Sequence, residues 1–356
     1  MKKQLLRLFP VPQIVHPRAC GISIEDDSVV LSQAIVPSNE HDAQRVELAP
    51  GIVEHGELKK PDLLHEALVS LRRTSRYAHA VVSLPTDAGF LVRMELDSAV
   101  TDIYEGVLLG IEEYVPVNPS ELLVAVEHIN TTNEGAQRVL VTAYPRALVS
   151  AYEEALVRAG FDPVATESSM HALSRALVDQ DLRGSTLLVS VGRERAHAIV
   201  VVANRPWLVS TIGMGWQRIV DAVARASQTT QSDAKRIVFT HGFSRLANKE
   251  LFGLMVPAAA ALRDEIAKVV RFWDSHQERA WGKAQRIHSV IITGHGAAIP
   301  GIERHMEVGL GIRMRVQSPW DVITRDGDAV PFLARNESLG YAAAAGVYIR
   351  AHTKQW

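Results

Sequence analysis

Hydrophobic and polar positions alternate in two segments of the chain in a way that predicts β-hairpins. The segment 21–35, GISIEDDSVVLSQAI, has two apolar runs around the polar turn EDDS. The segment 185–206, STLLVSVGRERAHAIVVVANRP, repeats this arrangement around the turn GRERA. A strand, a polar turn and a returning strand therefore open both halves of the chain, which is typical of an internal duplication.

Apolar residues at helical spacing predict amphipathic helices between these units. In the segment 61–74, Leu64, Ala67, Leu68 and Leu71 fall on one face. Further helices are expected over 146–159, 168–178, 261–276 and, rich in small residues, 339–351. Apolar runs at 78–84, 90–96, 122–129 and 137–143 predict strands of an α+β insertion. The pattern as a whole predicts an α/β protein.

Length and composition predict a globular protein with more than one core. The chain has 356 residues, which exceeds the size at which a single hydrophobic core usually keeps growing. Its 47% hydrophobic and 22% charged residues exclude a disordered or fibrous class. The formal net charge of -2 gives no field that attracts a polyanion, so nucleic acid is not an expected partner.

The cysteine content and the N-terminus predict a cytoplasmic location. Cys20 is the single cysteine, so no internal disulfide forms, and we expect it to be a small buried residue. The start, MKKQLLRLFP, lacks a long apolar region and a cleavage site, and no apolar run reaches the roughly 18 residues of a membrane span. Residues 1–17 are cationic and apolar, which fits either peripheral contact with an anionic membrane, a partner's groove, or a frayed end.

Enzyme motifs are not found in the sequence. There is no HExxH, no clustering of Cys and His, no GxSxG and no GxxxxGK[ST] loop. We therefore name no catalytic residue and no metal ligand.

Several segments together carry a resemblance to a known family. They are GISIEDDSVVL at 21–31, VVSLPTDAGFLVRMEL at 81–96, LVTAYPRALVSAYEEALVRAGFDPVATESSMHALSRAL at 140–177 and IITGHGAAIPGIERHM at 291–306. In order and spacing they resemble the PilM family of type IV pilus assembly proteins, and more distantly FtsA. The resemblance covers nearly the whole chain and implies the actin-like two-lobed fold, in which two ribonuclease H-like lobes are duplicated and an α+β subdomain, 1C, is inserted in the first.

The resemblance also implies domain boundaries. After the segment 1–17, lobe 1A covers 18–77 and returns as a helix over 167–182. The inserted subdomain 1C covers 78–166. The second lobe covers 183–356, with subdomain 2B inserted in 2A at about 220–286.

In the family, two hairpin turns and a late glycine turn hold ATP and Mg²⁺ between the lobes, and this chain departs from that pattern. At the two positions that are acidic in the family, this chain has Ser23 and Ser190. Its first turn has carboxylates where the family has small residues. Carboxylates repel a triphosphate. Lys235 replaces the Glu of the base-binding AExxK helix, and Val238 replaces its Lys. The candidate, degenerate nucleotide-binding residues are Ser23, Glu25, Asp26, Asp27, Ser190, Gly192, Arg193, Gly213, Gly215, Lys235, Gly294, Gly296 and Ala297.

These departures predict a pseudo-ATPase, and ATP with Mg²⁺ is implied by family resemblance only. Arg193 and Arg195 in the second turn have three open interpretations. They clamp a phosphate, remain in solvent, or pair across the cleft with Glu25, Asp26 and Asp27.

The resemblance implies a scaffold at the inner face of the inner membrane that binds the cytoplasmic tail of a PilN-like membrane protein in a groove between 1A and 1C. Two alternatives stay open. One is an active or nucleotide-binding ATPase of the same fold, for which Asp26 or Asp27 would have to organise the metal. The other is an FtsA-like protein that self-associates into polymers on a membrane.

Overall fold

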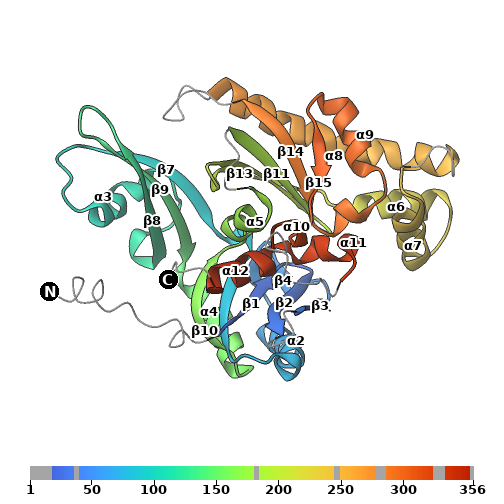
Figure 1. The fold of residues 1–356 in the computed structure, drawn as a ribbon, viewed down its shortest axis with the longest axis horizontal. Helices are drawn as coiled ribbons and strands as arrows, with labels where there is room; N and C mark the ends of the chain where they lie inside the picture. The colour runs from blue at the N-terminus through green and yellow to red at the C-terminus, as the bar shows by residue number, and fades with distance from the viewer. Residues whose placement is uncertain are drawn as a thin grey trace.

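The computed structural model describes residues 18–35, 40–179, 184–243, 249–276, 286–323 and 333–352. The predicted N-terminal segment 1–17 lies outside them. The described residues form two lobes, each built around a five-stranded sheet, and a smaller inserted sheet at one side (Figure 1).

The first lobe contains the first predicted hairpin. Its strands, in spatial order, are β10 (Asp162–Ser168), β6 (His79–Leu84), β1 (Cys20–Ile24), β2 (Ser28–Ile35) and β3 (Glu40–Glu47). Strand β1 pairs antiparallel with β2 and parallel with β6. All five residues of β1 are buried, including Cys20 as expected, because both faces of this central strand are covered.

The second lobe repeats this arrangement. Its strands, in order, are β13 (Arg205–Ile212), β12 (Ala196–Val202), β11 (Ser185–Val191), β14 (Ile287–Thr293) and β15 (Met314–Val316). Strand β11 pairs antiparallel with β12 and parallel with β14, as β1 does with β2 and β6. The predicted duplication is therefore visible in strand order and direction.

The inserted sheet has the order β7 (Phe90–Leu96), β9 (Gln137–Pro145) and β8 (Leu122–Thr131). The helices α3 (Ile103–Gly110) and η3 (Ile111–Glu113) accompany it, and η4 (Pro119–Glu121) leads into β8. Its own core includes Met94, Val107, Ile111 and Val141. Strand β6 and the first five residues of β10, 162–166, fall within the predicted insertion 78–166 but belong to the first-lobe sheet, where β10 pairs parallel with β6.

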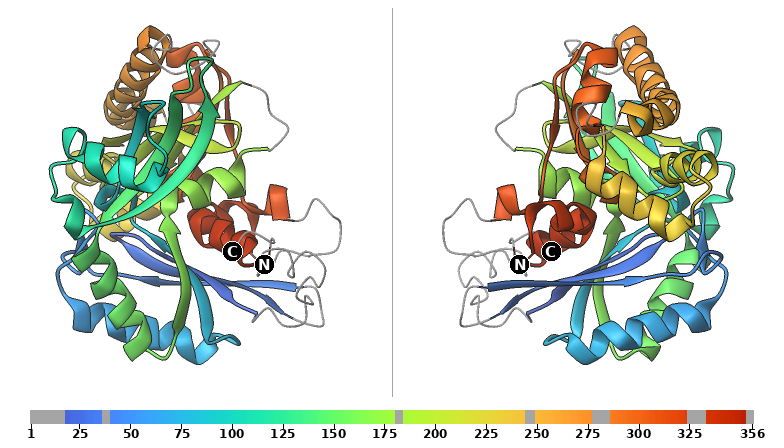
Figure 2. Two further views of the ribbon diagram at one scale, coloured as in Figure 1. Left: turned by 90° about the vertical axis from the view of Figure 1, so that its left-hand side faces the viewer. Right: turned by 90° about the vertical axis from the view of Figure 1, so that its right-hand side faces the viewer.

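Helices cover both faces of the first-lobe sheet (Figure 2). On the outer face lie α2 (Pro61–Thr74) and α4 (Arg146–Arg158), and the predicted apolar face of α2 is buried. On the inner face, α5 (Ser169–Leu177) packs against α12 (Ala342–His352). Helix α12 lies in the part predicted as second lobe, yet it packs on β1. Small residues permit this, because a Cβ on Gly21 of β1 would lie 2.3 Å from the carbonyl oxygen of Ala344. Likewise, a Cβ on Gly346 would lie 1.9 Å from the carbonyl oxygen of Ala172 in α5.

The second lobe carries the remaining helices. They are α6 (Gln217–Ala226), α7 (Gln231–His241), α8 (Lys249–His276), η6 (His295–Ala298), α9 (Ile302–Leu310), α10 (Trp320–Ile323), α11 (Arg335–Ser338) and η7 (Leu339–Tyr341). The short connections β4 (Val53–Glu54), β5 (Glu57–Leu58) and η2 (Thr86–Ala88) lie in the first half of the chain. Within the described ranges, no helix is both long and apolar enough to cross a membrane.

Candidate functional site

A cavity of about 320 Å³ lies in the cleft between the lobes, at the turns of both hairpins. Of the candidate residues from the sequence, eight line it: Ser23, Glu25, Asp26, Asp27, Ser190, Gly192, Arg193 and Gly294. Carboxylates outnumber guanidinium groups on its walls two to one. The charged residues are Glu25, Asp26, Asp27, Glu54, Asp87, Glu194, Arg45, Arg193 and Arg195.

The remaining candidates lie around the cavity rather than on its wall. A Cβ on Gly215 would meet the carbonyl oxygens of Gly192 and Arg193 at 2.3 Å, so Gly215 supports the second hairpin turn. Gly296 packs on Val191, and Ala297 is buried. Gly213 has open space beside it, and Lys235 lines a neighbouring pocket.

The first hairpin turn directs Asp26 toward its own lobe. The Glu25 N–H donates to the Ser28 carbonyl oxygen at 2.9 Å and closes the turn. The Asp26 carboxylate then accepts the backbone N–H groups of His55 and Gly56, each at 3.0 Å. Both donors have positive φ, 56° and 75°, which turns their N–H groups to one side. Burial raises the pKa of Asp26, and these two hydrogen bonds oppose the shift.

Glu25 and Asp27 are also held by protein groups. Glu25 accepts a 2.8 Å hydrogen bond from the Ser169 hydroxyl at the start of α5. Burial raises the pKa of Glu25 to about 7, although the nearby charge of His197 acts in the opposite direction. Asp27 accepts the Ser28 hydroxyl at 2.8 Å and lies 3.4 Å from the Arg45 guanidinium.

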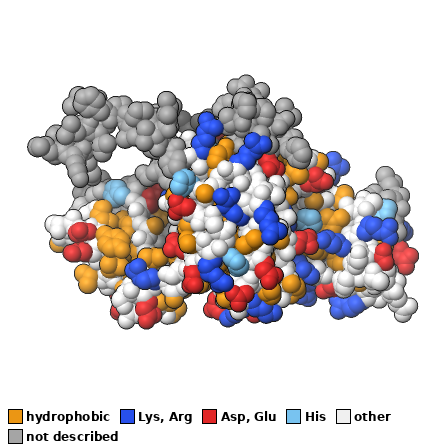
Figure 3. Space-filling model, turned by 90° about the horizontal axis from the view of Figure 1, so that it is seen from below, with side chains coloured by type: hydrophobic (Ala, Val, Ile, Leu, Met, Phe, Trp, Pro, Cys, Tyr) orange, Lys and Arg blue, Asp and Glu red, His pale blue; other side chains and the backbone are white. Residues whose placement is uncertain are grey.

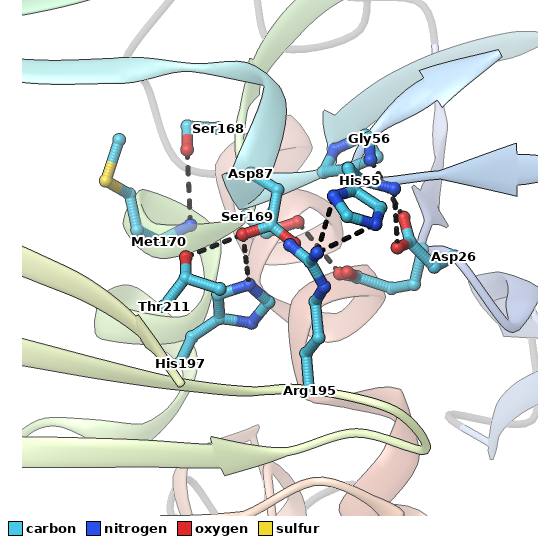
Figure 4. Close-up of polar contacts among 12 residues, drawn as sticks. Asp26, His55, Gly56, Asp87, Ser168, Ser169, Met170, Arg195, His197 and Thr211 are labelled. Carbon is cyan, nitrogen blue, oxygen red and sulfur yellow. Dashed lines mark hydrogen bonds and ion pairs between the residues drawn. The ribbon is translucent and has the colours of Figure 1, made fainter. Parts of the chain in front are cut away.

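Asp87 joins the two lobes (Figure 4). It stands in η2, between β6 of the first-lobe sheet and β7 of the inserted sheet. Its carboxylate accepts hydrogen bonds from three side chains of the second lobe: His197 Nε2 at 3.0 Å, Thr211 Oγ1 at 2.6 Å and the Arg195 guanidinium at 3.2 Å. Burial alone would raise its pKa, but the hydrogen bonds from His197 and Thr211 and the charge of Arg195 hold it below the usual range. We call Asp87, Arg195, His197 and Thr211 the interlobe clamp.

Arg193 and Arg195 were predicted to clamp a phosphate, to remain in solvent, or to pair across the cleft. The interlobe clamp distinguishes these interpretations for Arg195 but not for Arg193. Arg195 crosses to the first lobe, but it pairs with Asp87 and approaches His55 Nε2 at 2.8 Å, rather than pairing with the acidic turn. Arg193 stays on its own turn, 3.6 Å from the Glu194 carboxylate. Burial would lower the pKa of His197, but Asp87 outweighs it and raises that pKa. Sequence reasoning missed Asp87, His197 and Thr211.

The inserted sheet also rests on the second lobe. Along β13, Val209 and Thr211 point to the same face as their β12 partners Ile199 and His197, whereas a register shift beside Trp207 puts Arg205 on the other face. Arg205 pairs with Glu127 of β8 at 2.5 Å, and Thr211 donates to Asp87. Leu91 of β7 and Val209 pack against one shared core cluster. The inserted sheet, the first lobe and the second lobe are thereby connected at one place.

Aromatic groups surround the late glycine turn. The His295 ring lies between Phe239, at 4.7 Å between centroids, and Trp216, at 5.5 Å. Burial, together with the charges of Arg45 and Lys235, lowers the pKa of His295 to about 4. The neutral ring therefore packs in this cluster at neutral pH.

The groups present do not fit the Mg²⁺ and triphosphate that the family pattern implies. Both family acidic positions are serines, and Ser23 is buried at the end of β1. The nearby carboxylates of Asp26 and Asp27 are already hydrogen-bonded to protein donors. In the described part of the chain, no cluster of three or more His, Cys, Asp or Glu side chains is suited to hold a metal.

Exposed apolar side chains gather on the inserted subdomain. Four of the large ones stand in or beside α3, η3 and β8: Tyr104, Leu109, Tyr114 and Leu123, of which Leu109 is 85% exposed. Figure 3 shows hydrophobic side chains gathered at the left end of the molecule, where this subdomain lies. Among the described strands, β8 pairs with β9 alone, so its other edge is unpaired. Leu123 points to the face of β8 opposite to Leu122 and Val124, which pack with α3, so it lies apart from the other three. We call Tyr104, Leu109, Tyr114 and the β8 edge the 1C surface.

Comparison with known proteins identifies the family and the fold. The family model described as type IV pilus assembly protein PilM matches residues 36–352. A search of the curated proteins finds no match.

Solved structures share the fold at low sequence identity. The PilM-PilN type IV pilus biogenesis complex aligns with 18% identity over 95% of this chain and 99% of that chain, with a TM-score of 0.75. The ethanolamine utilization protein EutJ from Carboxydothermus hydrogenoformans aligns with 12% identity over 97% of both chains, with a TM-score of 0.54. MreB 5 of Spiroplasma citri bound to AMPPNP aligns with 10% identity over 93% and 95%, with a TM-score of 0.52. The predicted actin-like fold is confirmed.

Proposed function

Because this chain belongs to the family of the type IV pilus assembly protein PilM, we propose that it is an adaptor that binds the cytoplasmic tail of a PilN-like membrane protein. A scaffold role in pilus assembly follows from the family. The observation that carries the finer proposal is the likeness of the whole chain to the PilM-PilN complex, with a TM-score of 0.75. Binding such a tail would place the protein at the inner face of the inner membrane.

The 1C surface supports this role. An extended peptide that pairs with the free edge of β8 gains main-chain hydrogen bonds, and alternate side chains enter pockets beside the strand. Tyr104, Leu109 and Tyr114 expose apolar area that such side chains would bury. The tail would run between the inserted sheet and the first lobe.

The cleft supports a pseudo-ATPase rather than an ATPase. Six carboxylates line the cavity in which a triphosphate would have to bind. The interlobe clamp joins the lobes with protein groups and needs no ligand to do so. The cleft therefore serves to hold the inserted subdomain in place.

A binding experiment tests the adaptor proposal. A fluorescent peptide with the sequence of the cytoplasmic tail of a PilN-like protein is titrated with the full chain, and anisotropy gives the Kd. We expect Leu109→Glu to weaken binding about tenfold or more, because the charge would be buried against the peptide. Val308→Glu is the matched control, since Val308 is 87% exposed but lies on α9 of the second lobe.

Two results would count against the adaptor proposal. One is a folded wild-type chain that binds no tail peptide. The other is equal weakening by Leu109→Glu and Val308→Glu, which would point to a general effect of charge rather than to the 1C surface.

A further inference from the structure

Helix α3 of the inserted subdomain has apolar side chains on two sides. Val107 and, just after the helix, Ile111 are fully buried in the core of the subdomain. Tyr104 and Leu109 of the same helix are 49% and 85% exposed. A helix on the surface of a globular protein normally has polar residues on its outer side. The exposed apolar side chains of α3 therefore indicate a surface that another segment covers.

The same surface is acidic. Between residues 97 and 121, which include α3, η3 and η4, the chain has six carboxylates and no lysine, arginine or histidine. All six residues are exposed: Asp97, Asp102, Glu105, Glu112, Glu113 and Glu121. A ligand of the 1C surface therefore meets negative charge and apolar area together.

Among the described residues, no ion pair compensates this charge. In the inserted subdomain, Glu95 pairs with Arg138 on the neighbouring strand. Glu127 pairs with Arg205 of the second lobe. Neither of these carboxylates belongs to the six. Uncompensated charge on an exposed surface attracts cationic ligands within about 8 Å, the Debye length at physiological ionic strength.

The chain itself has a segment of complementary composition. Residues 1–17 include Lys2, Lys3 and Arg7 and have no acidic residue. Large apolar residues lie next to these cations in the sequence: Leu5, Leu6, Leu8 and Phe9. The segment therefore offers the positive charge and the apolar side chains that the 1C surface lacks.

The segment is long enough to reach that surface. It joins the described chain at Arg18, just before β1, where Cys20 pairs with Ala80 of β6. The inserted sheet follows the other end of β6, so the segment has to run the six residues of this strand, about 20 Å. Seventeen extended residues span up to about 56–61 Å. More than half of the segment is therefore left to cross the inserted sheet.

Covalent attachment makes even a weak contact effective. A short flexible connection gives the segment an effective concentration on the order of 1 mM at the surface. A segment that bound as a free peptide with a Kd of about 0.1 mM would then cover the surface in about nine-tenths of the molecules.

We propose that residues 1–17 dock on the 1C surface of the same chain, with their cations against the carboxylates of α3 and η3 and their apolar side chains against Leu109. The docked segment covers the surface assigned above to the partner's tail, so the tail has to displace it. This regulatory consequence rests on the proposed function, whereas the docking itself does not. Coverage of nine-tenths of the molecules weakens the apparent affinity for the tail about tenfold.

Paramagnetic NMR on the full chain tests the docking in the absence of any tail. A nitroxide is attached at Gln4→Cys, while the buried Cys20 stays unmodified. Leucine methyl groups carry ¹³C, and Leu109→Met and Leu254→Met assign two signals. We expect the nitroxide to broaden the Leu109 signal and to leave the signal of Leu254, on α8 of the second lobe, sharp. A mixture of nitroxide-bearing chains without ¹³C and ¹³C-labelled chains without nitroxide should show no broadening.

Charge reversal tests what holds the segment. Lys2→Glu, Lys3→Glu and Arg7→Glu together should abolish the broadening and strengthen binding of the tail peptide about tenfold. The matched control makes the same change in net charge on the second lobe, with Arg236→Glu, Lys268→Glu and Arg304→Glu. These three side chains are 76%, 63% and 90% exposed, and we expect no effect on the broadening.

Three results would overturn the docking. They are a sharp Leu109 signal in the nitroxide-bearing chain, equal effects of the two triple variants, and broadening in the mixture, which would show that a second copy supplies the segment. Broadening that the first triple variant abolishes, together with an unchanged affinity for the tail, would support the docking and count against the 1C surface as the site of the tail.

Discussion

Replacing Asp87 by asparagine removes the negative charge of the interlobe clamp while keeping the size of the side chain. Asp87 is 7% exposed, and its partners Arg195 and His197 are 25% and 15% exposed. Removing one partner of a buried ion pair costs about 3–5 kcal/mol, because the other charge stays buried without compensation. Since Arg195 retains some contact with water, we expect the lower end, about 3 kcal/mol.

The loss depends on pH in a defined way. The pKa of Asp87 in the folded chain lies below its ordinary value of 3.8, so its contribution to stability is present above that pH and is lost as the pH falls further. The pKa of His197 is raised above 6.5, so its contribution is present below pH 6.5 and is lost as the pH rises through the folded value. The difference in the free energy of unfolding between wild type and Asp87→Asn is therefore largest between pH 3.8 and pH 6.5.

Urea unfolding of both proteins, followed by circular dichroism at about pH 5.5 and about pH 8.5, measures this difference. The lobes can unfold in separate steps, so the first transition is the one compared. Arg236→Gln serves as a control, because it breaks an exposed pair with Asp233 and should change the free energy of unfolding by less than about 0.5 kcal/mol. An Asp87→Asn chain as stable as wild type at the lower pH would refute the clamp.

Three other predictions concern single residues. The free energy of unfolding of Glu25→Gln minus that of wild type should rise by about 2 kcal/mol from about pH 5 to about pH 8 in urea unfolding. The reason is that the buried Glu25 carboxyl, with its pKa raised to about 7, resists ionisation in the folded chain, so wild type loses stability over this range. An equal difference at both pH values would contradict this. Gly346→Ala should lower the free energy of unfolding by about 2 kcal/mol, because its Cβ would lie 1.9 Å from the Ala172 carbonyl oxygen. Gly253→Ala, in open space on α8, should raise it by up to about 1 kcal/mol. Melting temperatures in the reverse order would exclude this packing. The buried Cys20 thiol, whose pKa is raised to about 11, should react with a thiol reagent at neutral pH only after unfolding, and full labelling of the native chain would show the burial to be wrong.

The local pattern was sufficient for elements that bury one face or form a short hairpin. The predicted hairpin 21–35 is β1 and β2, and the apolar spacing of Leu64, Ala67, Leu68 and Leu71 is the buried face of α2. Strands β10 and β13 were not predicted. β10 is mostly only half-buried, and β13 starts near a proline and buries only two of its residues, so neither shows a clear apolar alternation.

The interlobe clamp could not be predicted from the sequence because its residues are far apart along the chain. Asp87 is separated from Arg195, His197 and Thr211 by 108, 110 and 124 positions. No spacing rule connects them, and a single aspartate after a strand is usually a turn residue. The substituted hairpin turns were found only because the family pattern indicated where to look. The domain boundaries stay a prediction. The sequence alone could not show that β6, inside the predicted insertion 78–166, pairs with β1 of the first lobe, because this pairing joins segments about 60 residues apart.

Calorimetric titration of Mg-ATP into the full chain tests most directly whether protein groups have replaced the nucleotide in the cleft. With six carboxylates on the cavity wall and the lobes already joined through Asp87, we expect no saturable heat and no phosphate release. Saturable binding at micromolar Mg-ATP, accompanied by phosphate release that a cleft variant abolishes, would contradict the account.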